Sequence, residues 1–406
     1  MIQRPIKCVR DFLTLRLSPG SSLLLALSGG GDSLALLYLL FECRRYLDFD
    51  LHVAHVDHAW REESSEEAQI LEKLMKHHKL PFHQKRLPLC SGSNLEDRYR
   101  EMRYEFFGQL QETHGFQALL LAHHADDQGE TILKRICEGA RLGALGGLKP
   151  ETKRKNLILW RPLLPLCKRE LNVYLDQNRI TPFDDWTNRD TTYLRPRMRL
   201  KIFPELENQF GKKIGSNFNR LGHLFQSVAA YLDEKRQQLS SHLVSGPFGQ
   251  YLENPSSFHP LEMRFFLEEE ARSAKAHLSQ DSCDLLLELI ENKATKALID
   301  AKPLTFVLNQ DYLFILKGAF PIYDRVKWKV NKEASDWKDF WKGEVPFFPK
   351  NVEITEMNAL EPLIKKKVKK WYAKYKVPSF FHDKAPIFTF EGRIIGECLT
   401  GKSLNI

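Results

Sequence analysis

Short apolar segments alternate with helix-like periodicity along the first half of the chain. Mostly apolar runs lie at 23–27, 51–56, 118–122 and 157–164, and a less regular one lies at 82–87. Helical patterns separate these runs. Apolar strands that alternate with helices are typical of a parallel sheet covered on both sides. The pattern therefore predicts an α/β fold with an open, mostly parallel sheet and helices on both faces.

The pattern changes near residue 212, where helical periodicity takes over. Two strand-like segments at 304–308 and 312–316 flank a polar turn and predict a hairpin. A charged, tryptophan-rich stretch at 330–341 then precedes further short strand signals. We therefore predict three parts: an α/β catalytic domain at 1–211, a mainly helical module at 212–325, and a small basic α+β module at 326–406.

A dense run of lysines lies at 365–370. Ile364, Val368, Trp371 and Tyr375 recur at helical spacing, which predicts an amphipathic helix with lysines outside its apolar face. A charge run is usually a solvated face, but a one-sign cluster in a basic chain favours contact with a nucleic-acid backbone. The candidate contacts are Lys366, Lys369 and Lys370.

The composition narrows the class of protein and its partners. The chain has 406 residues, 43% of them hydrophobic, which suffices for more than one packed core. A formal net charge of +8, unevenly distributed, is compatible with a polyanionic partner. Seven scattered cysteines without a CxxC pair indicate reduced thiols. No apolar run is long enough to span a membrane and no signal peptide is recognisable, so we expect a soluble, cytoplasmic protein.

The most informative segment, SGGGDS, follows the first predicted strand and leads into an apolar helical run. Consecutive glycines allow backbone N–H groups to converge on one anion, and the positive end of the next helix adds attraction. The common P-loop is excluded because its GxxxxGK[ST] spacing is absent. We therefore predict a phosphate-binding loop, with an empty strand-to-helix turn as the alternative. The loop comprises Ser28, Gly29, Gly30, Gly31, Asp32 and Ser33.

A second polar group follows another apolar strand and opens a helix. It contains His123, His124, Asp126, Asp127 and Glu130. One carboxylate could cap the helix, which would be a purely structural role for Asp126 or Asp127. Three carboxylates at the end of a strand are better explained by a hard divalent cation that bridges ligand phosphates. The histidines adjoin oxygen ligands rather than thiols, so we expect them to orient substrate or transfer protons.

Arginines cluster in two further polar segments. Arg98 and Arg103 lie on a predicted helix, and Arg195, Arg197 and Arg199 alternate after the segment DWTNRDTTYL. Most helix arginines are solvated, but inward-pointing ones are candidates for recognition of phosphate or carboxylate. The alternation predicts an extended strand whose arginines line one side and contact phosphates.

The loop SGGGDS resembles the PP-loop of the N-type ATP pyrophosphatases, which cleave ATP between its α and β phosphates and adenylate an oxygen. Further segments narrow the resemblance when they are taken in order: HVDHAWREESSEEA, NLEDRYREMRYEFF, LAHHADDQGETILKR, GARLGALGGL, WRPLL and DWTNRDTTYLRPRMR. As a set they resemble the tRNA(Ile)-lysidine synthetase family. The resemblance spans the whole chain, because that family also has a helical module and a small C-terminal module with a KVP segment, here 376–378.

The resemblance implies a ligase that acts on the isoleucine tRNA with the CAU anticodon. ATP would adenylate O2 of the cytidine at the first anticodon position. The amine of free L-lysine would then attack C2 and expel AMP, which gives lysidine. The same resemblance implies ATP as co-substrate, Mg²⁺ as cofactor, tRNA binding by the two C-terminal parts, and a homodimer as one expected assembly.

The resemblance also implies roles for individual residues. The SGGGDS loop would hold the departing pyrophosphate, and Asp32 with Asp126 or Asp127 would hold Mg²⁺. Glu130 and Asp57 would grip the cationic lysine. The catalytic set is Asp32, His124, Asp126, Asp127 and Glu130, the metal ligands are Asp32 and Asp127, and the substrate and tRNA contacts are Asp57, Arg98, Arg103, Arg195, Arg197, Lys366, Lys369 and Lys370.

Two other functions are compatible with parts of this pattern. A tRNA thiolation enzyme uses the same adenylation but delivers sulfur, and it usually needs cysteines near its site. Cys90 and Cys137 are isolated, and a small apolar role accounts for each of them. A non-catalytic RNA-binding protein would have no need of an intact loop and carboxylate cluster.

The chain departs from the family pattern at three places. They are Asp57, the pair Ala59-Trp60, and Pro196, which removes a backbone donor between two arginines. These changes bear on the fine contacts of the site and leave the expected reaction unchanged.

Overall fold

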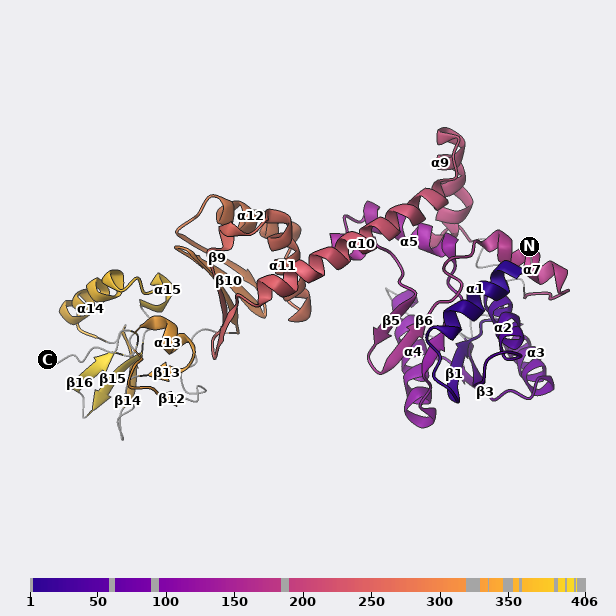
Figure 1. Cartoon of the computed structure of the whole chain (residues 1–406), viewed down its shortest axis with the longest axis horizontal. Coiled ribbons are helices and arrows are strands. Elements are labelled where there is room, and N and C mark those ends of the chain that lie inside the picture. Colours follow the sequence, from indigo (N-terminus) through magenta and orange to yellow (C-terminus); the bar gives the residue numbers. More distant parts are fainter. Residues whose placement is uncertain are drawn as a thin grey trace. The chain divides into compact units, whose positions relative to one another are not determined.

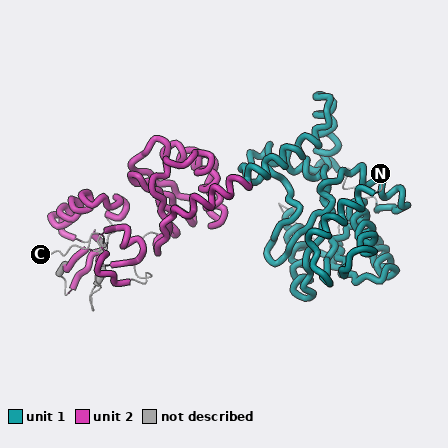
Figure 2. Tube along the Cα trace, viewed as in Figure 1, with its two compact units in different colours: residues 1–229 teal, residues 230–406 magenta. Residues whose placement is uncertain are grey.

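The computed structural model describes residues 3–57, 63–88, 95–183, 190–318, 329–334, 336–345, 353–357, 360–382, 386–390, 393–397 and 399. The chain forms two compact units, residues 1–229 and 230–406 (Figure 2). The predicted domain boundaries near 211 and 325 stay predictions. The departure at Ala59-Trp60, Cys90 and the segment 184–189 lie outside the described residues.

A six-stranded sheet forms the centre of the first unit (Figure 1). Its strands are β1 Ser21–Ala26, β2 Phe49–Asp57, β3 Phe82–Arg86, β4 Ala118–Leu120, β5 Glu151–Arg154 and β6 Leu157–Trp160. They lie in the order β3-β2-β1-β4-β6-β5, and every neighbouring pair is parallel except β5 with β6. The predicted open, mostly parallel sheet is confirmed.

Helices cover both faces of this sheet, because successive residues of a strand point to opposite sides. Leu23 and Leu25 of β1 pack into one core, and Leu24 packs into the other. The first core includes side chains of α1 Gln3–Thr14, α2 Gly31–Cys43, α3 Glu63–His77 and α7 Lys168–Gln177, and the second includes those of α4 Leu95–His114. Burial on both faces explains why the strands are continuous apolar runs.

A series of consecutive helices completes the first unit. They are α5 Ala125–Cys137, α6 Leu142–Leu145, α8 Leu194–Arg197, a π-helical turn Met198–Ile202, α9 Phe203–Phe210 and α10 Ile214–Ser240, which ends in the second unit. The short helix α6 lies in the glycine-rich segment 139–148. The side-chain amide of Gln128 holds this segment by donating to the carbonyls of Gly146 and Leu148, each at 3.1 Å.

The extended strand predicted at Arg195, Arg197 and Arg199 is wrong, because these residues lie in α8 and the π-helical turn. Residues two apart on a helix point in different directions, so Arg197 does not share a side with Arg195 or Arg199. Leucine, arginine and methionine favour helix formation. Pro196 is tolerated because it lies in the first turn, where a backbone N–H has no helical partner to lose.

The second unit is built on an antiparallel sheet in the order β7-β8-β11-β10-β9. Its strands are β7 Val244–Gly246, β8 Gly249–Glu253, β9 Lys296–Ala301, β10 Leu304–Asn309 and β11 Tyr312–Lys317. The pairing of β10 with β11 confirms the predicted hairpin. A 3-10 turn, Pro255–Ser257, precedes α11 Pro260–Ser273 and α12 Gln280–Glu291, whose apolar side chains share a core with the sheet.

The C-terminal segment packs on the same antiparallel sheet. It contains β12 Lys329–Val330, α13 Trp337–Trp341, β13 Glu344–Val345, β14 Glu353–Glu356, α14 Pro362–Lys374, α15 Ser379–His382, β15 Pro386–Phe390 and β16 Arg393–Glu397. One core joins Tyr251 and Phe314 of the five-stranded sheet to Trp341, Tyr372 and Phe388. Among the described residues, none of the helices is long and apolar enough to cross a membrane.

Candidate active site

The loop between β1 and α2 is shaped by one glycine and two serines. Gly29 has a φ of +86°, and a Cβ there would lie 2.4 Å from Cδ2 of Phe183. The Ser33 hydroxyl donates to the carbonyl of Gly30 at 2.9 Å, and its Oγ accepts the backbone N–H of Ser28 at 3.2 Å. Gly30, at the cap position of α2, has no side chain to occupy the first N–H groups of the helix. The predicted loop is therefore a fixed backbone turn that ends in an anion-attracting helix terminus.

A distant lysine brings a positive charge to this loop. Nζ of Lys168, at the start of α7, pairs with Oδ1 of Asp32 and would lie 3.7 Å from a Cβ on Gly31. Lys168 was not predicted from the sequence, because it lies 136 residues beyond Asp32. Its one sequence signal is its place at the start of the helix that follows β6. A common P-loop carries a lysine in its own motif, whereas the lysine beside this loop comes from another helix.

His124 lies among three carboxylates at the start of α5. Its Nε2 is 3.5 Å from Oδ2 of Asp32 and 3.5 Å from Oδ2 of Asp127. Its Nδ1 accepts the backbone N–H of Asp126 at 3.2 Å, which places the proton of the neutral ring on Nε2. Burial lowers the pKa of His124, but the neighbouring Asp32, Asp127 and Asp126 outweigh burial and raise it. This imidazole can take up a proton and keep the resulting charge stabilised.

Asp32 is held as a carboxylate. Burial alone would raise its pKa, but the contact with His124 and the charge of Lys168 lower the pKa of Asp32 to about 2. A separation of 3.5 Å is long for a hydrogen bond, so we ascribe the effect of His124 mainly to its charge.

Asp126 and Asp127 both have structural contacts as well. Oδ2 of Asp127 accepts the N–H of His124 at 3.0 Å and completes a capping box on α5. Oδ2 of Asp126 accepts the N–H of Lys168 at 2.7 Å, at the start of α7. The capping role that the sequence suggested is present for Asp127 on α5, whereas Asp126 accepts an N–H at the start of a different helix, α7. These contacts also join the starts of α5 and α7 beside the phosphate-binding loop.

Glu130 lies about one turn further along α5 and is only 4% exposed. Its Oε1 accepts from Nε of Arg199 at 2.8 Å, and Nη2 of Arg199 lies 3.3 Å from Oδ1 of Asp127. Its Oε2 is buried and has no hydrogen-bonding partner among the described residues. Burial raises the pKa of Glu130 in spite of Arg199. A buried acceptor in this state is suited to a donor from a ligand.

The other predicted contacts lie apart from these carboxylates. Asp57 ends β2, is 3% exposed, and has Oδ2 3.6 Å from Nε of Arg86. Because β1 separates β2 from β4, Asp57 lies about 10 Å across the sheet from the strand that leads into α5. Arg98 and Arg197 are exposed on α4 and α8. The geometry therefore groups Asp32, His124, Asp126, Asp127 and Glu130, and leaves Asp57 at the same edge of the sheet but outside the group.

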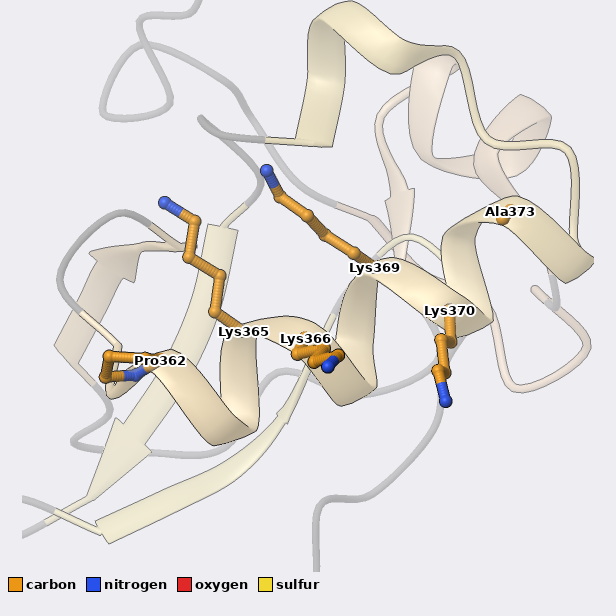
Figure 3. A pocket seen from close by; sticks show the side chains of 6 residues that line it. All are labelled: Pro362, Lys365, Lys366, Lys369, Lys370 and Ala373. Atoms are coloured by element: carbon orange, nitrogen blue, oxygen red, sulfur yellow. The ribbon is translucent and has the colours of Figure 1, made fainter.

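The predicted lysine-rich helix is confirmed as α14. Val368 is buried, and Ile364, Trp371 and Tyr375 pack against the same core, as their spacing predicts. An open groove runs along the opposite surface of the helix (Figure 3). Lys365 and Lys369 extend to one side of α14 and Lys370 to the opposite side. The groove is lined by Pro362, Lys365, Lys366, Lys369, Lys370 and Ala373.

Known proteins with similar sequences show the family to which this chain belongs. Residues 4–206 match the family described as the PP-loop domain. The tRNA(Ile)-lysidine synthase of Protochlamydia amoebophila is 31% identical over 98% of this chain and 93% of the relative, and that of Chlamydia muridarum is 40% identical over 56% and 71%. A solved structure, the U34-tRNA thiolase NcsA from Methanococcus maripaludis, matches over 56% of this chain and 78% of its own length at 18% identity, with a TM-score of 0.47. The match along nearly the whole of both chains shows that this chain belongs to the tRNA(Ile)-lysidine synthase family of PP-loop enzymes.

Proposed function

We propose that the protein ligates free L-lysine to C2 of the cytidine at position 34 of the isoleucine tRNA with the CAU anticodon. Membership of the family supports an ATP-dependent ligase that modifies tRNA. The observation that carries the finer proposal is Glu130, a buried carboxylate beside the phosphate-binding loop and the His124 cluster, with one oxygen left for a ligand. A cationic amine is the donor that such an oxygen favours.

The first step is adenylation of the base. O2 of the cytosine attacks the α-phosphorus of ATP, an O–P bond forms, and the bond to the β-phosphate oxygen breaks. The backbone N–H groups at the start of α2 and the ammonium of Lys168 would stabilise the charge that develops on the departing pyrophosphate. Adenylation turns a poor leaving oxygen into the phosphate of AMP.

Two carboxylates beside the loop would serve as ligands of Mg²⁺. Oδ2 of Asp32 and Oδ2 of Asp127 converge on Nε2 of His124 from two different helices, and carboxylate oxygens are the ligands Mg²⁺ prefers. Within the described residues, no set of three or more His, Cys, Asp or Glu side chains forms a complete metal site. We therefore propose that Asp32 and Asp127 hold the ion together with ATP phosphates, where it would offset phosphate charge.

The second step joins lysine to the base. The lysine nitrogen attacks C2, a C–N bond forms, and the C2–O bond breaks so that AMP leaves. We propose that Oε2 of Glu130 binds an ammonium group of lysine and that His124 takes the proton released by the attacking amine. The surrounding carboxylates raise the pKa of His124, so its imidazole binds a proton more strongly than a free imidazole does.

The lysines of α14 would contact the tRNA backbone. Lys366, Lys369 and Lys370 line the groove along α14, a helix that is fixed by its apolar face, and a cluster of cations suits repeated phosphates. Asp57, Arg98, Arg103, Arg195 and Arg197 stay predicted contacts of substrate or tRNA. The cytoplasmic location and the homodimer also stay part of the proposal.

Sulfur transfer would need an activated thiolate near the loop. Cys167 precedes Lys168, but burial and the nearby Glu170 and Asp126 raise the pKa of its thiol, which is the opposite of activation. Cys137 is exposed at the end of α5, about 18 Å along the helix from its start. These positions favour lysine over sulfur as the second substrate.

The test uses radiolabelled lysine, ATP, Mg²⁺ and the isoleucine tRNA with the CAU anticodon. The wild-type protein should transfer label to the tRNA, whereas Glu130→Gln should still release pyrophosphate but transfer little label. Glu138→Gln is the matched control, because it removes an exposed carboxylate at the end of the same helix. Wild-type transfer of sulfur without transfer of lysine, or full lysine transfer by Glu130→Gln, would overturn the proposal.

A further inference from the structure

A cationic cluster adjoins the acidic one on the side of the sheet away from β1. It contains Arg100 and Arg103 of α4, Arg161 directly after β6, and the exposed Arg195 of α8, and the charges of all four act on His123. Arg195 also acts on Glu130, so the two clusters are neighbours. Arg103 and Arg195 are predicted from the sequence as separate contacts, and their proximity to Arg161 and His123 is not predictable from spacing.

The buried Tyr104 ring organises the α4 side of this cluster. The guanidinium carbons of Arg100 and Arg103 lie 5.4 and 5.8 Å from its centroid. Arg154 lies closest to the ring, at 4.1 Å, and is paired with Glu101. Cation–π contacts hold guanidinium groups in place without neutralising them. Arg100 and Arg103 therefore keep their charge available to a ligand.

Several buried donors in the cluster are left unused. Arg161 is only 5% exposed, and its Nη1 donates to the carbonyl of Lys149 and to Oγ1 of Thr152. In the described part of the chain, Nε of Arg161, Nε of Arg103 and Nδ1 of His123 are buried without a hydrogen-bonding partner. Over the same residues, none of Arg100, Arg103, Arg161 and Arg195 forms an ion pair with a carboxylate.

Such a cluster is unfavourable without an anion. Burial and then the charges of Arg161 and Arg195 lower the pKa of His123 to about 3, so the ring stays neutral. Burial also lowers the pKa of Arg103 and of Arg161. Like charges held together and partly out of water destabilise the fold unless a counter-charge is present. Buried nitrogens without hydrogen-bonding partners and arginine charges without a counter-charge are together the features expected of an anion-binding site.

The position of the cluster limits which anion it binds. The phosphate-binding loop follows β1, and β4 lies between β1 and β6, so Arg161 is about 10 Å from the loop across the sheet. The carboxylate of free lysine carries an ammonium on the same carbon, and four guanidinium groups would repel that ammonium. A phosphodiester of RNA has no cation attached to it. The bidentate geometry of arginine also suits phosphate oxygens.

We propose that Arg103, Arg161 and Arg195, with the neutral His123, bind one phosphodiester of the tRNA anticodon loop next to nucleotide 34. This inference rests on the proposed function, because it requires that nucleotide to enter the site. Contact with the adjacent phosphate would fix the unstacked base between the ATP loop on one side and Glu130 on the other. The cluster is thus a positioning site for the nucleic acid, separate from the loop that binds ATP.

The test measures tRNA affinity as a function of salt for Arg103→Gln and Arg103→Lys. Loss of one phosphate contact should weaken binding about tenfold and reduce the salt slope by about 0.7, while the lysine variant should keep most of the slope. Arg44→Gln is the matched control, because Arg44 is exposed just beyond the end of α2 that lies away from the phosphate-binding loop. The KM values for ATP and for lysine should stay within twofold of wild type in all three variants.

Neutral methylphosphonate linkages on either side of nucleotide 34 identify the phosphate. One of these substitutions should weaken wild-type binding about tenfold and should weaken Arg103→Gln by less than twofold, since the contact is already lost. Equal losses in wild type and variant, or an unchanged salt slope in Arg103→Gln, would overturn the inference. A large rise in the KM for lysine alone would assign the cluster to the amino-acid carboxylate. Failure of the wild-type protein to transfer lysine refutes the proposed function instead, and these binding measurements do not depend on that transfer.

Discussion

Replacing Arg199 by glutamine should shift the loss of lysine binding in acid to a higher pH. Arg199 is the cation that contacts Glu130, and burial already raises the pKa of Glu130 in spite of it. If the Glu130 carboxylate binds the lysine ammonium, the KM for lysine rises as the pH falls through the pKa of Glu130. Without Arg199 that pKa rises further, so the increase in KM should begin at a higher pH.

The size of the shift follows from the exposure of the pair. An opposite charge in contact lowers the pKa of a carboxyl group by about 1 to 3 units. Glu130 is buried, but the Arg199 side chain is 39% exposed, and solvent screens part of its charge. We therefore take the lower end, a shift of about 1 unit, which corresponds to about 1.4 kcal/mol.

The assay is the KM for lysine at saturating ATP and tRNA, measured from about pH 5.5 to 9. Lys201→Gln is the matched control, because it removes an exposed positive charge from the same π-helical turn two residues away. The control should keep the wild-type profile. If the KM for lysine of Arg199→Gln begins to rise at the same pH as in wild type, or at a lower pH, the role assigned to Glu130 is refuted.

The remaining predictions concern the loop, the second unit and the lysine helix. Asp32→Asn should abolish AMP release while leaving tRNA affinity within about twofold. The pKa of Asp32 is about 2 in the folded state against an ordinary 3.8, so the ionised side chain adds about 2 kcal/mol to the free energy of unfolding above pH 3.8. This contribution is lost as the pH falls toward 2, so the free energy of unfolding should fall less steeply with acid in the variant. Gly246→Ala should destabilise the second unit by about 3 kcal/mol in denaturant unfolding, because its Cβ would lie 1.9 Å from the carbonyl oxygen of Trp341, whereas Gly318→Ser has open space and should be milder. Lys366→Gln with Lys370→Gln should lower the salt slope of tRNA binding by somewhat less than 2, and an unchanged slope would return α14 to a merely solvated face.

The fold could be predicted largely from local pattern. The strands of the first unit are buried on both faces, so each gives a short apolar run that alternates with helical periodicity. The SGGGDS loop was recognisable because its backbone conformation requires glycine, and consecutive glycines are visible in the sequence. The amphipathic face of α14 was predictable for the same reason, since helical spacing is a local property.

The contacts that complete the site were not predictable from spacing. Lys168 contacts Asp32, 136 residues away in the sequence, and Arg199 contacts Glu130, 69 residues away. Hydrophobic periodicity predicts helices and strands but not which helix start lies beside which strand end. The arginines near 195 were misassigned to a strand because charged side chains carry little information about backbone conformation. Helix propensity, rather than alternation of charge, was the better guide at that segment.

The most direct test of the central claim is the mass of nucleoside 34 after the tRNA has been incubated with protein, ATP, Mg²⁺ and lysine. Ligation of lysine to C2 predicts a nucleoside with the mass of cytidine plus lysine minus one water, formed only when ATP and lysine are both present. Cytidine that stays unchanged, or cytidine in which sulfur has replaced oxygen, would contradict it.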